Sequence, residues 1–267
     1  MDWNFLLLQL LVGLGAGLIS GALGLGGGIL MVPAFLTFVP QMETHTAKGT
    51  SLFLIIFISA INAWRQNRSL DRIPWGLAAW LATGSIVGGY LSAWLTAMLP
   101  ENVTLILFLF LLVLMAWRTF LIKPRPVDPN AVSLNRPIAI GIGLAAGIFG
   151  GATGTGGGSV LIPLALMAGL VVNERAVGLS NLVMVATAIA GTIAHLMATP
   201  IYPSDWTVGH VYFGIIPLVF LGAQISSPLG ERLNHLLTLP RRKALMGVML
   251  LLIALRLGYR LYTITPP

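Results

Sequence analysis

The chain has 267 residues, of which 57% are hydrophobic and only 9% are charged, and its formal net charge is +7. Soluble domains carry about 25% charged residues, so this composition excludes a soluble enzyme, a nucleic-acid-binding protein and a disordered protein. The absence of cysteine excludes disulfides and cysteine-ligated metals. The remaining class is an all-α polytopic membrane protein.

Ten apolar segments follow one another along the chain, and several approach the ~20 residues that cross a bilayer as a helix. Two of them are too short to cross alone, and each of these follows a cluster of glycines. One linker, rich in Lys, Arg and Pro, has soluble character and divides the chain into a first repeat (1–121), a cytoplasmic linker (122–136) and a second repeat (137–267). The expected segments are 5–23, 29–39, 50–64, 75–98, 103–121, 137–152, 159–172, 177–198, 209–230 and 244–262.

The two halves resemble each other in sequence. Residues 13–36 read GLGAGLISGALGLGGGILMVPAFL, and residues 143–166 read GLAAGIFGGATGTGGGSVLIPLAL. At a fixed offset of 130 positions, 12 of 24 residues are identical, and the glycine and proline positions are kept. An Ala-x-Gly-x-Ser sequence follows each block, at 47–51 and 176–180. These matches predict an internal duplication.

The distribution of basic residues predicts that the halves are inverted. Loop 65–72, the linker and loop 231–243 are rich in Lys and Arg, whereas loops 99–102 and 199–208 contain neither. Basic loops lie in the cytoplasm, which places 65–72 inside and its counterpart 199–208 outside. Each half would then contain three transmembrane helices and a glycine-broken helical hairpin that returns to its own side. If 5–39 formed one tilted span instead, the two halves would be parallel.

Inverted repeats with broken helices are typical of secondary transporters. A helix that starts at mid-membrane presents free N–H groups and a partial positive charge, which suit an anion. An alternative is that glycines only allow helices to pack closely, which fits Gly13, Gly17 and Gly21 at their spacing of four. The glycines expected to contact substrate are Gly26, Gly27 and Gly28 in the first half and Gly156, Gly157 and Gly158 in the second.

Polar side chains near these glycines complete the predicted site. Thr50, Ser51, Ser180 and Asn181 are expected to bind the anion, and Ser51 and Ser180 occupy matched positions. The alternative for the hydroxyl groups is a hydrogen bond to a carbonyl of their own helix. Lys48 could attract an anion, but an ordinary interfacial lysine is the expectation; His195 is likewise expected to be interfacial rather than a proton relay.

Other chemistries find little support in the sequence. No Asp or Glu falls at the centre of a predicted span, which argues against a carboxylate-based proton pump or cation antiporter. Ser180 and His195 cannot form a serine-protease dyad, because 15 residues of one helix separate them by roughly 22 Å. Phosphate-loop and metal-site patterns are missing. We therefore expect no enzyme activity, no cofactor, no metal and no nucleic-acid partner.

The duplicated Gly-x-x-Gly-x-Gly-Gly-Gly…Pro block, each followed by Ala-x-Gly-x-Ser, resembles the TauE/SafE family of membrane permeases. The matching positions are Gly24, Gly26–Gly28, Pro33 and Gly49–Ser51, then Gly154, Gly156–Gly158, Pro163, Gly178 and Ser180. The resemblance implies a multi-pass protein of the bacterial inner membrane that exports sulfite or organosulfonates, and it allows a homodimer. Two alternatives stay open: a non-transporting membrane scaffold or assembly factor, and an anion channel.

Overall fold

The computed structural model describes residues 3–39, 42–68, 72–121, 135–200 and 205–264. Within them the protein is an all-α polytopic membrane protein, and five helical stretches are long and apolar enough to cross a membrane (Trp3–Leu23, Thr44–Asn67, Arg136–Thr153, Asn173–Leu196 and Phe213–Leu236). The helices are α1 (Trp3–Leu23), α2 (Gly28–Phe38), α3 (Thr44–Asn67), α4 (Trp75–Ala97), α5 (Glu101–Leu121), α6 (Arg136–Thr153), α7 (Gly158–Met167), α8 (Asn173–Leu196), α9 (Ile216–Leu236) and α10 (Leu239–Ile264).

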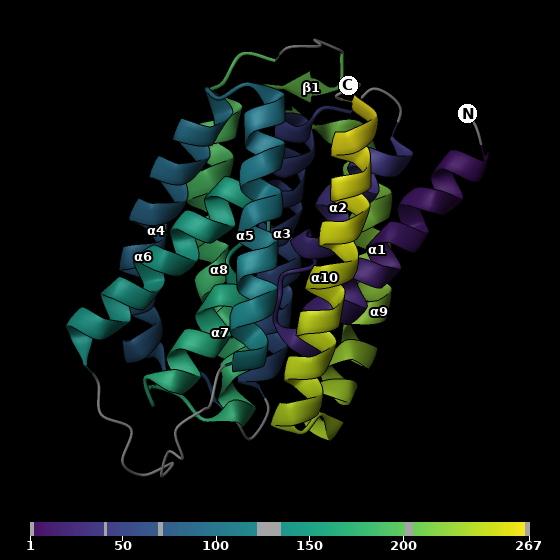
Figure 1. Ribbon diagram of the computed structural model, residues 1–267. Coiled ribbons are helices and arrows are strands. Elements are labelled where there is room, and N and C mark those ends of the chain that lie inside the picture. Colours follow the sequence, from purple (N-terminus) through teal and green to yellow (C-terminus); the bar gives the residue numbers. More distant parts are fainter. Residues whose placement is uncertain (1–2, 40–41, 69–71, 122–134, 201–204, 265–267) are drawn as a thin grey trace.

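The helices form one bundle in which each long helix of the first half packs against a helix of the second half. Helix α1 packs along α9, and α4 packs along α6. Helices α3 and α8 lie against each other inside the bundle, and α5 lies beside α10 on the outside (Figure 1). Helix α1 begins at the end of the bundle that carries the N label, whereas α6 begins at the opposite end (Figure 1).

Close approach of backbones explains the glycines of α1 and α6. A Cβ atom at Gly13 or Gly17 would lie 2.2 or 2.1 Å from a carbonyl oxygen of α9. A Cβ atom at Gly143 or Gly147 would lie 2.0 or 2.4 Å from a carbonyl oxygen of α4. The close-packing interpretation of Gly13 and Gly17 is therefore confirmed, since no side chain fits between these helices.

The glycine clusters interrupt the chain in the same way in both halves. Gly24, Gly26 and Gly27 have φ values of 68°, 73° and 73°, and their counterparts Gly154, Gly156 and Gly157 have 74°, 82° and 86°. This left-handed region is open to glycine and costly for other residues. Each loop ends α1 or α6 and begins the short helix α2 or α7, as the sequence predicts.

The prediction of an apolar helical segment over 209–230 is wrong at its start, because α9 begins only at Ile216. Thr207–Val208 (β1) and Val211–Tyr212 (β2) form a short antiparallel hairpin, and a 3₁₀ turn at Phe213–Ile215 (η1) precedes α9. Gly209 has a φ of 56°, and a Cβ atom there would lie 2.4 Å from the His195 carbonyl oxygen. The chain thus turns tightly against the end of α8 before the helix can start. Most of the predicted linker lies outside the described residues.

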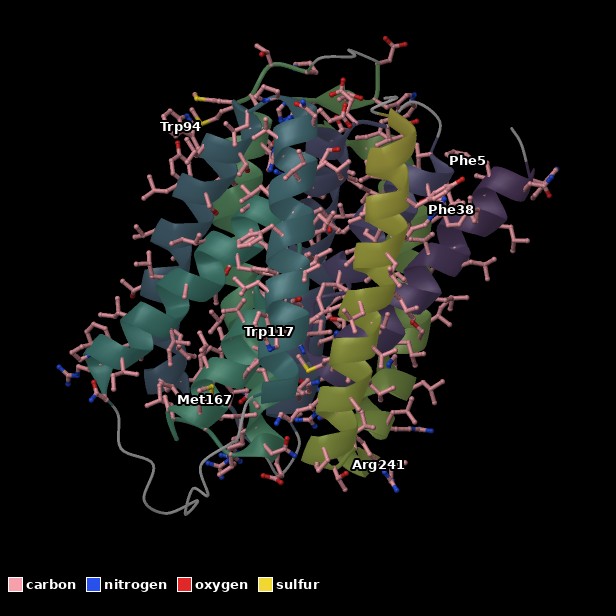
Figure 2. The ribbon with its side chains drawn as sticks, viewed as in Figure 1. Phe5, Phe38, Trp94, Trp117, Met167 and Arg241 are labelled. Carbon is pink, nitrogen blue, oxygen red and sulfur yellow. The ribbon has the colours of Figure 1, made fainter. Side chains whose placement is uncertain are left out.

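The outer surface of the bundle is rich in large apolar side chains. Phe38, Trp94 and Trp117 are between 45% and 65% exposed, and they project from the bundle (Figure 2). A soluble protein rarely leaves such apolar surface uncovered. Arg241 lies at the opposite end of the molecule from Trp94 (Figure 2). The arrangement is that of a lipid-embedded bundle.

Candidate site at the paired glycine loops

The two glycine loops touch each other at the buried centre of the bundle. A Cβ atom at Gly28 would lie 2.8 Å from the Gly154 carbonyl oxygen, and one at Gly158 would lie 2.3 Å from the Gly24 carbonyl oxygen. Each first residue of a short helix therefore packs against the loop of the other half. This contact brings the N-terminal ends of α2 and α7 together.

Two serines hold these loops by crossed hydrogen bonds. Ser51 Oγ on α3 donates to the Gly154 carbonyl oxygen at 2.8 Å. Ser180 Oγ on α8 donates to the Gly24 carbonyl oxygen, also at 2.8 Å. Both side chains are fully buried. Each hydroxyl group thus donates to the loop of the opposite half. Neither serine makes the alternative hydrogen bond to a carbonyl oxygen of its own helix.

The starts of α2 and α7 keep polar groups available. Neither N-cap residue, Gly27 or Gly157, provides a side-chain hydrogen bond to the helix. The first N–H groups of a helix have no partner within it, and their dipoles favour negative charge. Ser159, the second residue of α7, has a buried hydroxyl oxygen without a hydrogen-bond partner. Such an N-terminus can accept an anion.

Asn181 belongs to a buried polar cluster between α1, α3 and α8, which we call the amide cluster. Asn62 Nδ2 donates to Ser20 Oγ at 2.9 Å, and Ser20 Oγ donates to Asn181 Oδ1 at 3.4 Å. Asn181 Nδ2 donates to Gln66 Oε1 at 3.4 Å. The amide of Asn181 is thus held by neighbours from two other helices. Beside the loop at Gly24, this cluster offers neutral hydrogen-bond donors and acceptors inside the bundle.

Thr50 lies apart from the loops. Its Oγ1 accepts a hydrogen bond from the Tyr212 backbone N–H at 2.9 Å, so it contacts the β1–β2 hairpin. Thr50 immediately precedes Ser51 on α3, but its side chain faces a different partner. Of the predicted polar residues, Ser51 and Ser180 meet at the loops, Asn181 lies in the amide cluster, and Thr50 binds the hairpin.

Lys48 and His195 are not exposed at the bundle surface, as ordinary interfacial residues would be. Both side chains are fully buried inside the protein. Lys48 Nζ donates to Thr96 Oγ1 at 3.0 Å, and the Lys48 Cα would lie 2.7 Å from a Cβ atom at Gly154. In the other half, the contact that corresponds to Lys48 and Gly154 is made by Val177, whose Cα would lie 3.1 Å from a Cβ atom at Gly24. Aligning the two repeats pairs Lys48 with Val177, and that pairing could have singled out the lysine.

Two ionisable groups near Lys48 lie outside the spans. Burial lowers the pKa of His210, although the hydrogen bond of its ring with the Thr199 carbonyl oxygen raises it; the charge of Lys48 also lowers it. Burial raises the pKa of Glu43, and the negative charge of Glu101 adds to this effect. The Glu101 carboxylate accepts hydrogen bonds from the backbone and hydroxyl groups of Thr44, so it caps the start of α3.

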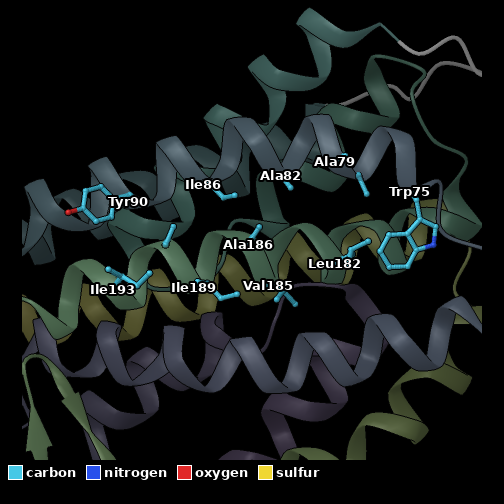
Figure 3. Close-up of a pocket in the computed structure, with 12 residues that line it drawn as sticks. Trp75, Ala79, Ala82, Ile86, Tyr90, Leu182, Val185, Ala186, Ile189 and Ile193 are labelled. Atoms are coloured by element: carbon cyan, nitrogen blue, oxygen red, sulfur yellow. The ribbon is translucent and has the colours of Figure 1, made fainter.

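A separate pocket of about 610 Å³ lies between α4 and α8 (Figure 3). Its lining is almost entirely apolar and includes Ile86, Ile189 and Ile193, with Tyr90 and Trp75 near its ends. An anion would lose its hydration there without gaining polar partners. This pocket is therefore unsuited to a small anion, in contrast to the glycine loops.

Comparison with known proteins identifies the family. The model of the family described as sulfite exporter TauE/SafE matches residues 9–257. The probable membrane transporter protein YunE of Bacillus subtilis is 27% identical and covers 96% of this chain and 98% of its own. A probable membrane transporter protein of Methanocaldococcus jannaschii is 30% identical, covering 88% and 90%. No solved structure matches. The chain belongs to the sulfite exporter TauE/SafE family of membrane transporters.

Proposed function

We propose that this protein is a secondary transporter that exports small anions, such as sulfite or organosulfonates, across the inner membrane of a bacterium. The observation that carries the proposal is the meeting of the α2 and α7 N-termini at two left-handed glycine loops. Backbone amides there can bind an anion without a full charge in the membrane interior. The family description supports sulfur oxyanions as the substrate class.

The binding groups in this proposal are the amides of Gly26–Gly28 and Gly156–Gly158 and the side chain of Asn181. Ser51 and Ser180 would position the loops, since their hydroxyl protons go to loop carbonyl oxygens, and Thr50 would act through the hairpin. The two halves would be inverted repeats, in agreement with the opposite starting ends of α1 and α6 (Figure 1). Movement of one half against the other would expose the loops to each side in turn.

Efflux from proteoliposomes tests this function. Vesicles that contain the purified protein and are loaded with sulfite should release it faster than protein-free vesicles, and the rate should saturate as the internal concentration rises. Saturation is expected because each transport cycle carries a bound anion. A rate that stays proportional to concentration would instead support an anion channel. Absence of flux for sulfite and for a simple alkanesulfonate would leave the scaffold as the better function.

Cysteine labelling tests the orientation of the halves. The chain has no cysteine of its own, and Arg68 and Asp205 are both exposed. We expect a membrane-impermeant maleimide applied to intact cells to label Asp205→Cys, and to label Arg68→Cys only after permeabilisation. The reason is that these positions follow matched helices of inverted repeats. Labelling of both variants from the same side would contradict the inversion.

A further inference from the structure

A second polar cluster lies at the end of the bundle covered by the β1–β2 hairpin. It consists of Lys48 and three histidines, His45 on α3, His195 on α8 and His210 in the hairpin turn. The four side chains are at most 2% exposed. Lys48 interacts electrostatically with each of the three imidazoles. We call this group the basic cluster.

Among the described residues, no carboxylate forms an ion pair with Lys48. Its ammonium group donates to Thr96 Oγ1, a neutral hydroxyl group whose own proton goes to the Ser92 carbonyl oxygen at 2.8 Å. The nearby Glu101 is engaged with Thr44 at the start of α3. A buried ammonium without a counter-charge is costly. An anion beside Lys48 would offset part of that cost.

The histidines form a chain with a defined direction. His210 Nε2 lies 3.1 Å from the Thr199 carbonyl oxygen, which can only accept, so this nitrogen carries a proton. In a neutral His210 ring, Nδ1 is then the acceptor. His195 Nδ1 lies 3.2 Å from it and donates. His195 Nε2 is consequently left with a lone pair, and this buried atom has no hydrogen-bond partner.

His45 also contributes a ring nitrogen without a hydrogen-bond partner. Its ring stacks on His210 with centroids 5.3 Å apart, and its Nδ1 is also buried without a hydrogen-bond partner. Glu43 and Glu101 are the acidic groups at this end of α3 and α5, and Glu101 points its carboxylate at Thr44. The cluster thus combines the buried Lys48 amino group with two buried ring nitrogens that can accept a proton.

We propose that the basic cluster is a second anion-binding site, which takes a small oxyanion together with one proton. The oxyanion would pair with the Lys48 ammonium group, and the proton would lie between an anion oxygen and His195 Nε2. This site rests on the proposed function for the identity of its ligand and extends it, because Lys48 packs directly on the Gly154 loop. An anion leaving the loops would meet it before the hairpin.

Proton uptake gives the site a pH dependence with a definite sign. If the bound state holds one proton more than the free state, affinity rises as pH falls, up to tenfold for each pH unit. Lys48, Glu43, Glu101 and the three histidines are titratable groups at this end among the residues that the structure describes. The carboxyl groups of Glu43 and Glu101 do not bind the anion, because a negative charge beside the anion would weaken its binding.

Calorimetry on the purified protein in detergent tests the site, with sodium sulfite as the probe and sodium chloride as a comparison. Titration in two buffers of different ionisation enthalpy reports the protons taken up. We expect wild type to take up about one proton per sulfite bound. Lys48→Met should weaken sulfite binding by about tenfold or more, and His195→Gln should remove most of the proton uptake. Arg241→Gln and His235→Gln, exposed at the far end, should match wild type.

Stability measurements separate a binding role from a structural one. Removing an unpaired buried charge should leave the melting temperature of Lys48→Met unchanged or raised. If that variant fails to fold, Lys48→Gln, which can still donate to Thr96, replaces it. Wild-type sulfite affinity in the lysine variant, or no sulfite binding by wild type, would overturn the site. Sulfite binding without efflux would contradict the proposed transport function but not this site. Efflux that is unaffected by the lysine variant would contradict this site but not the transport function.

Discussion

Gly157→Ala is expected to destabilise the protein by roughly 2 kcal/mol or more and to abolish sulfite efflux. Gly157 has a φ of 86°, and a Cβ atom there would lie 2.1 Å from the Ala146 carbonyl oxygen. Both the left-handed backbone and the contact with α6 oppose a side chain. The loop would have to shift, and with it the N-terminus of α7. Thermal unfolding in detergent and efflux from proteoliposomes measure the two effects.

Two further variants make this result specific. Gly27→Ala, at the matched position with a φ of 73° and an Ala16 carbonyl oxygen 2.8 Å from the added atom, should behave in the same way. Gly141→Ala is the control, because the space around this exposed helical glycine is open and alanine favours a helix. A Gly157→Ala variant that loses stability but exports sulfite at the wild-type rate would show that this glycine loop does not form the transport site.

The glycine loops could be predicted from sequence because the backbone conformation that a residue can adopt depends mainly on that residue itself. Only glycine adopts the left-handed conformation at low cost, so Gly26–Gly28 and Gly156–Gly158 indicate broken helices wherever the rest of the chain lies. The duplication then indicates that two such breaks exist, and that Ser51 and Ser180 are equivalent. The crossed hydrogen bonds fit this equivalence, although their partners across the bundle could not be read from either half alone.

The basic cluster could not be predicted in this way. His45, Lys48, His195 and His210 come from three elements, and a residue near the end of a helix looks interfacial when the hairpin that covers it is unknown. The hairpin itself resembles the start of a helix in sequence, because residues 211–216 are apolar and continue into α9. Burial of these ionisable side chains depends on tertiary contacts that sequence periodicity does not contain.

Ser51→Ala and Ser180→Ala should each cost roughly 1–3 kcal/mol in unfolding free energy, because each leaves a buried carbonyl oxygen without its side-chain donor. The two loops touch, so the double variant should deviate from the sum of the single ones by about 0.5 kcal/mol or more. Thr83→Ala is the control: its exposed hydroxyl group bonds only to the Ala79 carbonyl oxygen of its own helix. Thermal and denaturant unfolding provide these values.

The same two serines give a test of alternating access. Ser51 holds the loop beside the basic cluster, and Ser180 holds the loop beside the amide cluster. If transport alternates between two states related by the repeat, then releasing one loop favours one state and releasing the other favours the opposite state. We therefore expect the apparent sulfite affinity, measured from each side of the membrane, to change in opposite directions in the two variants. Changes in the same direction would show that the serines stabilise a fixed structure, and that the loops do not move against each other during transport.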